Sequence, residues 1–213
     1  KPRGPDTLVR VTHTGALDTA PAAIAGEPAP TDRELAGAIE AALAVYLEAR
    51  TAEASAIDPH YAAAADELSA FVLGGGKRIR PTFAWWGWRG AGGSVGAPEA
   101  MSVLRAVSAL ELIQACALVH DDLMDASTLR RGHPTVHVAF ARRHADAGWH
   151  GRPARFGAAA AILLGDLAMV WADDLFHTCG LPQETLVRAG VPWRAMRTEL
   201  LLPCCARHDL DVY

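Results

Sequence analysis

The chain has 213 residues, 51% of them hydrophobic, which is enough to bury a sizeable core as one domain. Its 20 Lys and Arg against 24 Asp and Glu give a net charge of −4, without the basic footprint of nucleic-acid-binding proteins, so we expect no nucleic acid partner. The four cysteines lack metal-ligand or disulfide-framework spacing, and no signal-peptide pattern is seen, which predicts a cytoplasmic protein.

The first sixty residues divide into an arm and a helix. Residues 1–30 are rich in Pro, Ala, Thr and Gly and lack hydrophobic periodicity, which predicts a flexible arm. Thr31 and Glu34 form a capping-box pattern, which predicts a helix from there to about Arg50. Apolar residues at helical spacing give this helix one buried face: Leu35, Ile39, Leu43 and Leu47.

Prolines and glycines delimit the later helices. Asp58 followed by Pro59 predicts the start of a second helix, which should end at Gly74. Further helices are expected to begin at four prolines: Pro81, Pro98, Pro134 and Pro182. One more helix should cover residues 158–177, a strongly apolar segment after the loop HGRPARFG. Strand alternation is absent, so we expect an all-α fold, with residues 31–213 forming one helical domain.

The longest apolar runs carry charged residues. Arg105 and Glu111 interrupt one run and Asp166 the other, so we expect no transmembrane segment. Asp166 could share a helix face with Asp173 and Asp174. A buried, hydrogen-bonded structural role is favoured for Asp166 over a second metal site.

The segment VHDDLMDASTLRRGHP, residues 119–134, concentrates charge of both signs. Asp121 and Asp125 lie four residues apart and share a helix face, with Asp122 beside them. Like charges at this spacing destabilise a helix, whereas a hard divalent cation takes carboxylate oxygens as ligands. Arg130 and Arg131 suit a phosphate, because a guanidinium binds it bidentately. The segment predicts a site for Mg²⁺ and a diphosphate; the alternative is a solvated helix end.

A second charged segment, GGGKRIRP, spans residues 74–81. Its glycines let the backbone approach a ligand, and Lys77, Arg78 and Arg80 place three positive charges before a helix N-terminus. The phosphate-loop pattern G-x-x-x-x-G-K-[ST] is not met, because Phe71 stands at the first glycine position. Taken alone, the segment favours a glycine cap followed by a solvated basic turn. Together with the aspartate cluster it indicates an anion site.

These two segments, joined by ELIQACALVHDD, resemble the motifs of the trans-isoprenyl diphosphate synthases, the polyprenyl synthetase family, over roughly residues 35–200. The resemblance implies a helical bundle of the isoprenoid synthase type. It also implies a homodimeric, Mg²⁺-dependent prenyltransferase of isoprenoid biosynthesis. Such an enzyme condenses an allylic diphosphate with isopentenyl diphosphate to make a longer trans-prenyl diphosphate.

The resemblance assigns roles residue by residue. Asp121, Asp122 and Asp125 would be catalytic and hold the Mg²⁺ ions that bridge the allylic diphosphate, which Arg130 would contact. Four residues would bind isopentenyl diphosphate: Lys77, Arg80, Gln114 and Arg131. Residues four, five and eight before Asp121 would line the pocket into which the product grows: Ala117, Cys116 and Ile113. Because the first two are small, we expect a product of geranylgeranyl length or longer.

The sequence departs from the family after MRTE, where it reads LLLPCCARHDLDVY and shows no second aspartate-rich motif. We therefore expect a partial synthase domain, incomplete at the C-terminus and inactive alone. A non-catalytic partner subunit of a prenyl synthase is the main alternative. A class I terpene cyclase is a weaker one, because a cyclase needs no isopentenyl diphosphate site.

Overall fold

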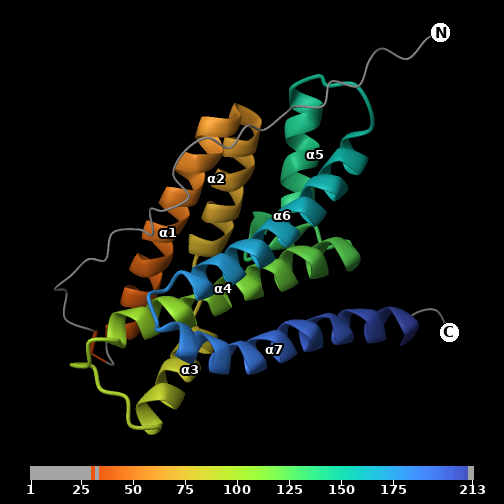
Figure 1. Ribbon diagram of the computed structural model, residues 1–213. Helices are drawn as coiled ribbons and strands as arrows, with labels where there is room; N and C mark the ends of the chain where they lie inside the picture. Colours follow the sequence, from red (N-terminus) through yellow and green to blue (C-terminus); the bar gives the residue numbers. More distant parts are fainter. Residues whose placement is uncertain (1–29, 32–33, 211–213) are drawn as a thin grey trace, which may run out of the picture.

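The structure, a computed structural model, describes residues 30–31 and 34–210, with side chains as far as residue 200 (Figure 1). Almost all of the expected arm lies outside these residues, so the division into an arm and one domain stays a prediction. The elements of the described part are α1 (Leu35–Ile57), α2 (Pro59–Leu73), α3 (Ile79–Gly90), α4 (Ala100–Met124), β1 (Leu129–Arg130), β2 (His133–Pro134), α5 (Val136–Asp146), α6 (Pro153–His177) and α7 (Gln183–Leu210). The all-α prediction is confirmed.

The start of α1 follows the capping pattern. Both the backbone N–H and the hydroxyl of Thr31 donate to Glu34 Oε2, at 3.1 and 2.8 Å, and these hydrogen bonds lower the pKa of Glu34. The helix continues to Ile57 rather than ending near Arg50, because residues 51–56 contain neither glycine nor proline. All four residues of the predicted stripe are buried: Leu35, Ile39, Leu43 and Leu47.

The next helices begin at or close to the predicted residues. Asp58 Oδ1 accepts hydrogen bonds from the backbone N–H groups of His60 and Tyr61, at 2.7 and 3.2 Å, which caps α2. α3 begins at Ile79, two residues before Pro81, because a proline without an N–H is tolerated in the first turn. α4 and α5 each begin two residues after the proline that predicted them, and α7 begins one residue after its proline.

Two local features differ from the prediction. α6 begins at Pro153, inside the segment 150–157 that was assigned to a loop, because proline suits the first helical position. A short hairpin of two-residue strands, β1 and β2, precedes α5. Its turn residues, Arg131 and Gly132, both have positive φ, 52° and 82°, as in the tight turns that match strand twist.

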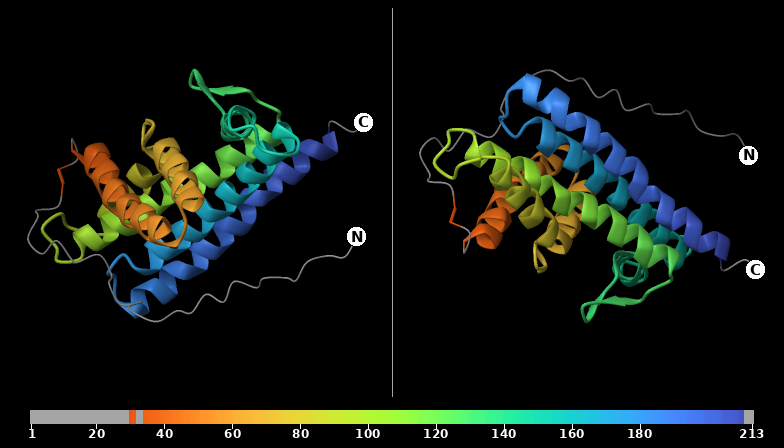
Figure 2. Two further views of the ribbon diagram at one scale, coloured as in Figure 1. Left: turned by 90° about the horizontal axis from the view of Figure 1, so that it is seen from above. Right: turned by 90° about the horizontal axis from the view of Figure 1, so that it is seen from below.

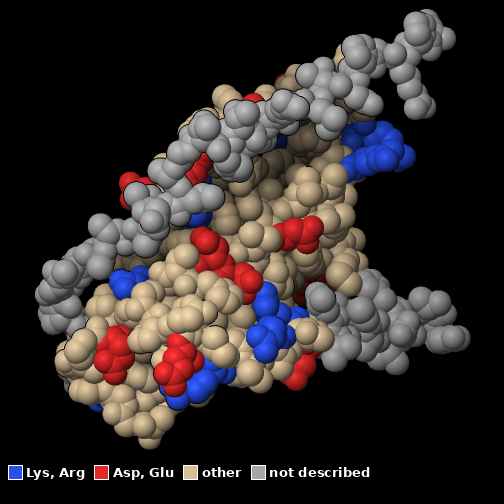
Figure 3. All heavy atoms as spheres, in the orientation of Figure 1, with Lys and Arg blue, Asp and Glu red and all other residues tan. Residues whose placement is uncertain are grey.

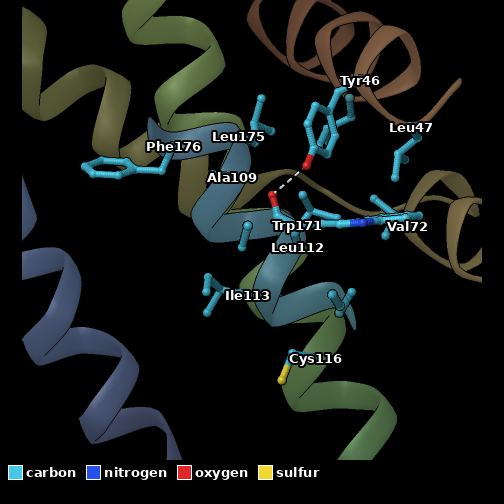
Figure 4. Close-up of a cluster of buried hydrophobic side chains, with 14 of the residues drawn as sticks. Tyr46, Leu47, Val72, Ala109, Leu112, Ile113, Cys116, Trp171, Leu175 and Phe176 are labelled. Atoms are coloured by element: carbon cyan, nitrogen blue, oxygen red, sulfur yellow. Dashed lines mark hydrogen bonds between the residues drawn. The ribbon is translucent and has the colours of Figure 1, made fainter. Parts of the chain in front are cut away.

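α4 is the central helix and contacts every other helix of the described part (Figure 1). Its inner face packs on α6 in a cluster that includes Leu112, Ile113 and Trp171 (Figure 4). The hydroxyl of Tyr46 on α1 lies 3.0 Å from Trp171 O and 2.8 Å from Asp174 Oδ2, and it donates to these acceptors. Burial, and then this carboxylate, raise the pKa of Tyr46, so the hydroxyl remains a donor.

α7 runs beside α6 (Figure 2). The rings of Phe176 and Trp193 stack with centroids 4.4 Å apart, and Trp193 Nε1 donates to Asp173 Oδ1 at 2.7 Å. Asp173 also pairs with Arg197 at 2.8 Å, so it has a structural role, as Asp174 does. The prediction of a buried Asp166 is wrong: its side chain is 64% exposed, and its Oδ1 lies 3.7 Å from His120 Nε2.

By length and composition alone, α4 and α6 could each cross a membrane. In the most apolar stretch of α4, 67% of the residues are buried inside the protein, against 39% in α6. The mostly buried stretch of α4 is typical of a core helix, whereas most of the stretch in α6 is not buried, so the expected absence of a transmembrane segment stays a prediction. On the face seen in Figure 3, acidic and basic side chains are interspersed over the centre of the molecule.

Candidate diphosphate and metal site

The three aspartates at the end of α4 lie in different surroundings. Asp122 is buried, and both of its oxygens accept hydrogen bonds from Arg130, from Nε and Nη2, each at 2.7 Å. Asp121 is 30% exposed, and its Oδ2 lies 4.0 Å from Arg130 Nη2. Asp125, which follows the last helical residue, is exposed. The hydrogen bond with Asp122 raises the pKa of Arg130, which therefore keeps its charge.

This arrangement fits a magnesium ion that is completed by its ligand. In the described part of the chain, no three His, Cys, Asp or Glu side chains are grouped to hold a metal ion. Mg²⁺, however, usually takes only one or two carboxylates and fills its other positions with water and substrate phosphates. Asp121 and Asp125 match that number, whereas the oxygens of Asp122 are bound by Arg130. The metal role of all three aspartates stays a prediction.

The hairpin brings the two charged segments together. Arg131 stands in its turn, and Arg131 Nη1 donates to the backbone oxygen of Gly75, which lies 56 residues earlier in the chain. Arg130, the preceding residue, is paired with α4 through Asp122. The hairpin therefore connects the aspartate end of α4 with the glycine-rich segment.

The three cations of the glycine-rich segment are not equivalent. Lys77 and Arg80 are exposed, whereas Arg78 is buried against Glu111 of α4. The segment therefore presents two positive charges to solvent rather than three. Gly75 and Gly76 have φ of 96° and 154°, which glycine adopts without strain.

A cavity of about 410 Å³ lies between α2, α4, α5 and the hairpin. Of the predicted ligand-binding residues, it brings together Gln114, Arg130 and Arg131, while Lys77 and Arg80 do not line it. Glu111 also lines it and was not singled out from the sequence. The sequence could have predicted this position of Glu111, because a residue three positions before Gln114 shares a helix face with it.

A second cavity, of about 690 Å³, is mostly apolar and lies between α3, α4 and α7. Its lining includes Trp88, Val107, Leu110, Trp193 and Met196. The residues predicted to limit product length line neither cavity: Ile113 and Cys116 are buried in the core (Figure 4), and Ala117 is half-buried. Their role stays a prediction.

The structure is an all-α bundle with carboxylates and paired arginines at one helix end, next to a basic glycine-rich segment. The family model described as polyprenyl synthetase matches residues 62–190, and the chain belongs to this family. The family prediction made from the motifs is confirmed.

Individual relatives agree with this assignment. The chain is 33% identical over 126 residues to the farnesyl diphosphate synthase of Haemophilus influenzae, covering 58% of this chain and 36% of that protein. It is 35% identical over 117 residues to the geranylgeranyl diphosphate synthase of Sulfolobus acidocaldarius, covering 54% and 29%.

A solved structure is also similar, that of geranylgeranyl pyrophosphate synthase from Corynebacterium glutamicum, complexed with isoprenyl diphosphate and magnesium. The TM-score is 0.75 with 42% identity, and the match covers 80% of this chain and 48% of that one. The chain thus spans half or less of the length of these relatives.

Proposed function

We propose that the chain carries the substrate site of a Mg²⁺-dependent prenyltransferase, which joins an allylic diphosphate to isopentenyl diphosphate. The observation that carries this proposal is the meeting of two charged segments at one cavity, through the contact of Arg131 with Gly75. The relative from Corynebacterium glutamicum, described with isoprenyl diphosphate and magnesium, supports the ligand class.

Asp121 and Asp125 would hold Mg²⁺, which would supply charge neutralisation for the departing pyrophosphate. Arg130 can serve the same diphosphate while it stays paired with Asp122. A guanidinium has five N–H donors, and Asp122 takes two of them. The donors that remain are available to phosphate oxygens, where a fixed positive charge stabilises the charge that develops as the C–O bond breaks.

Lys77, Arg80, Gln114 and Arg131 would bind the diphosphate of the second substrate. The exposed Lys77 and Arg80 lose little by turning towards a phosphate, and Arg131 can exchange one carbonyl acceptor for a charged oxygen. The C–O bond of the allylic diphosphate breaks, and its electron pair leaves with pyrophosphate. The electrons of the isopentenyl double bond form the new C–C bond at the allylic carbon, and loss of a proton restores a double bond. Apolar surroundings protect the cation from water.

We propose a product of geranylgeranyl length or longer. The apolar cavity supports this, because it lies along the same helix as the aspartates. Leu110 precedes Asp121 by eleven residues, about 16 Å along a helix at roughly 1.5 Å per residue. Ala117 lies between them and retains exposed surface, so a chain growing from the aspartates towards Leu110 would pass it.

We also propose a homodimer located in the cytoplasm. The outward face of α6 supports the dimer, since Ile162, Leu163 and Val170 are 48%, 66% and 62% exposed. Apolar residues grouped on one helix face are typical of surfaces that a second subunit covers. The cytoplasmic location depends on the cysteine pattern of the sequence.

Two measurements on the 213-residue chain test the proposal. Calorimetric titration should show binding of isopentenyl diphosphate, and Mg²⁺-dependent binding of an allylic diphosphate. The proposal is refuted if either ligand fails to bind. A product assay with both ligands then tests transfer, and measurable transfer would establish the enzyme and contradict our expectation that the chain is inactive alone.

The second candidate is a non-catalytic partner subunit of a prenyl synthase. A partner subunit should co-elute with a catalytic prenyl synthase and change the length or rate of its products. A chain that binds both diphosphates without affecting such a synthase would exclude this candidate.

A further inference from the structure

The Arg78 side chain is only 2% exposed, although it stands between two exposed cations of a polar segment. Its Nη1 donates to the backbone oxygen of Val72 at 2.9 Å and to Glu111 Oε2 at 2.8 Å. Its Nη2 lies 3.5 Å from Glu40 Oε2. One guanidinium therefore connects the start of α3 with α1, α2 and α4.

The backbone of Arg78 is held as firmly as its side chain. Arg78 has φ 48° and ψ 36°, the left-handed conformation that non-glycine residues adopt at a cost and keep only where the surroundings enforce it. Its backbone oxygen accepts from Thr82 N at 3.1 Å and from Thr82 Oγ1 at 2.7 Å, in the first turn of α3. The preceding glycines cannot supply this rigidity, because glycine is conformationally permissive.

The partner of Arg78 belongs to the same cavity as the predicted ligand-binding residues. Glu111 is 11% exposed and stands one turn before Gln114 on α4, and Arg78, Glu111 and Gln114 all line the cavity. Within the described part of the chain, Nε and Nη2 of Arg78 are buried without a hydrogen bond. Nη2 has the ion pair with Glu40, so Val72 O and Glu111 accept the hydrogen bonds that hold this side chain.

We propose that Arg78 is a positioning residue for isopentenyl diphosphate, an inference that rests on the proposed function. Its buried guanidinium holds the glycine-rich segment, which carries Lys77 and Arg80, on α4 through Glu111. Arg78 itself does not touch the ligand. Its loss therefore acts on one substrate and leaves the aspartate end of α4 intact.

The test compares Arg78→Lys with the wild-type chain. Lysine keeps the charge but lacks the planar guanidinium that donates to both Val72 O and Glu111. We expect the dissociation constant for isopentenyl diphosphate to rise about tenfold or more, because the segment that carries Lys77 and Arg80 is no longer held in place. The Mg²⁺-dependent constant for an allylic diphosphate should stay within about twofold. Amide hydrogen exchange should accelerate at residues 75–77, because the segment loses its anchor.

Arg105→Lys is the matched control. Arg105 is a half-buried arginine, and its guanidinium donates to Cys179 O at 2.8 Å and Ser102 Oγ at 3.3 Å, outside the cavity. This variant should lose stability without changing the affinity for either diphosphate. If Arg78→Lys fails to fold, Glu111→Gln replaces it, and the same selective weakening is expected because the ion pair is lost.

Four outcomes decide the matter. Selective weakening for isopentenyl diphosphate, with faster exchange at residues 75–77, supports the positioning role. Unchanged affinity in the folded variant overturns it. Equal weakening for both diphosphates also overturns it and assigns Arg78 to stability alone. Failure of the wild-type chain to bind isopentenyl diphosphate refutes the proposed function itself, and with it this role.

Discussion

The two cavities along α4 differ in what encloses them. The cavity beside Gln114 is bordered by directional contacts, in which charged side chains are held by hydrogen bonds: Arg130 to Asp122, Arg78 to Glu111 and Arg131 to Gly75. The cavity beside Leu110 is enclosed by packing, as in the stacked rings of Phe176 and Trp193. A charged ligand requires donors at set positions, whereas an apolar chain requires only space of the right shape.

Removing the exposed aspartates should affect only the polar end of α4. In the double variant Asp121→Ala and Asp125→Ala, Mg²⁺-dependent binding of an allylic diphosphate should fall roughly 100-fold or more, because the carboxylate that remains in the cluster, Asp122, is bound by Arg130. Calorimetric titration with and without Mg²⁺ measures this. Asp146→Ala, which removes an exposed aspartate on α5, is the control and should bind normally. Normal binding by the double variant would contradict the assignment of the metal site.

Asp122 should behave differently from its neighbours. Asp122→Ala leaves Arg130 without its bidentate partner, so we expect a loss of about 2 kcal/mol in the free energy of unfolding, less than for a fully buried pair because Arg130 is 28% exposed. Urea unfolding measures this. The exposed Asp125→Ala should change stability by less than about 0.5 kcal/mol. Similar losses for the two variants would mean that the ion pair contributes little.

The apolar cavity should discriminate ligands by length rather than by charge. Val107→Phe fills part of the cavity, so the affinity for geranylgeranyl diphosphate should fall about tenfold, while that for a short allylic diphosphate stays within about twofold. Ala117→Phe should shorten the product of an active synthase in the same way. Val187→Phe on the exposed surface of α7 is the control. Equal effects on long and short ligands would show that the tail does not enter this cavity.

The smallest effect is expected at the start of α1, where Thr31 and Glu34 line neither cavity. The hydrogen bonds from Thr31 lower the pKa of Glu34, so the contribution of Glu34 to stability is present above its unfolded-state pKa. It is lost as the pH falls through the lower pKa of the folded state. A carboxyl titration by NMR should show the lowered pKa, and Thr31→Val should return it towards the ordinary value. An identical titration curve in that variant would contradict this account.

Most of the fold could be predicted from local signals. Prolines and the Asp58 cap placed the helix starts to within about two residues, except at α6, where Pro153 opened the helix inside an expected loop. The end of α1 was missed because residues 51–56 contain no helix-breaking residue to mark it, and the next boundary is the cap of α2. Asp166 was expected inside because its sequence neighbours are apolar, but a helix has two faces and Asp166 is on the exposed one.

The sequence by itself determined the family and the presence of both charged segments, because the residue types and spacings that carry them are local. Tertiary structure decided the use of each charge. Arg78 and Arg80 are two residues apart in one basic run, yet α4 presents Glu111 only to Arg78 and buries it. Asp122 is likewise withdrawn from its cluster by Arg130, a residue the hairpin brings back to α4. Burial and pairing depend on which elements meet in space, and no spacing within one segment specifies that.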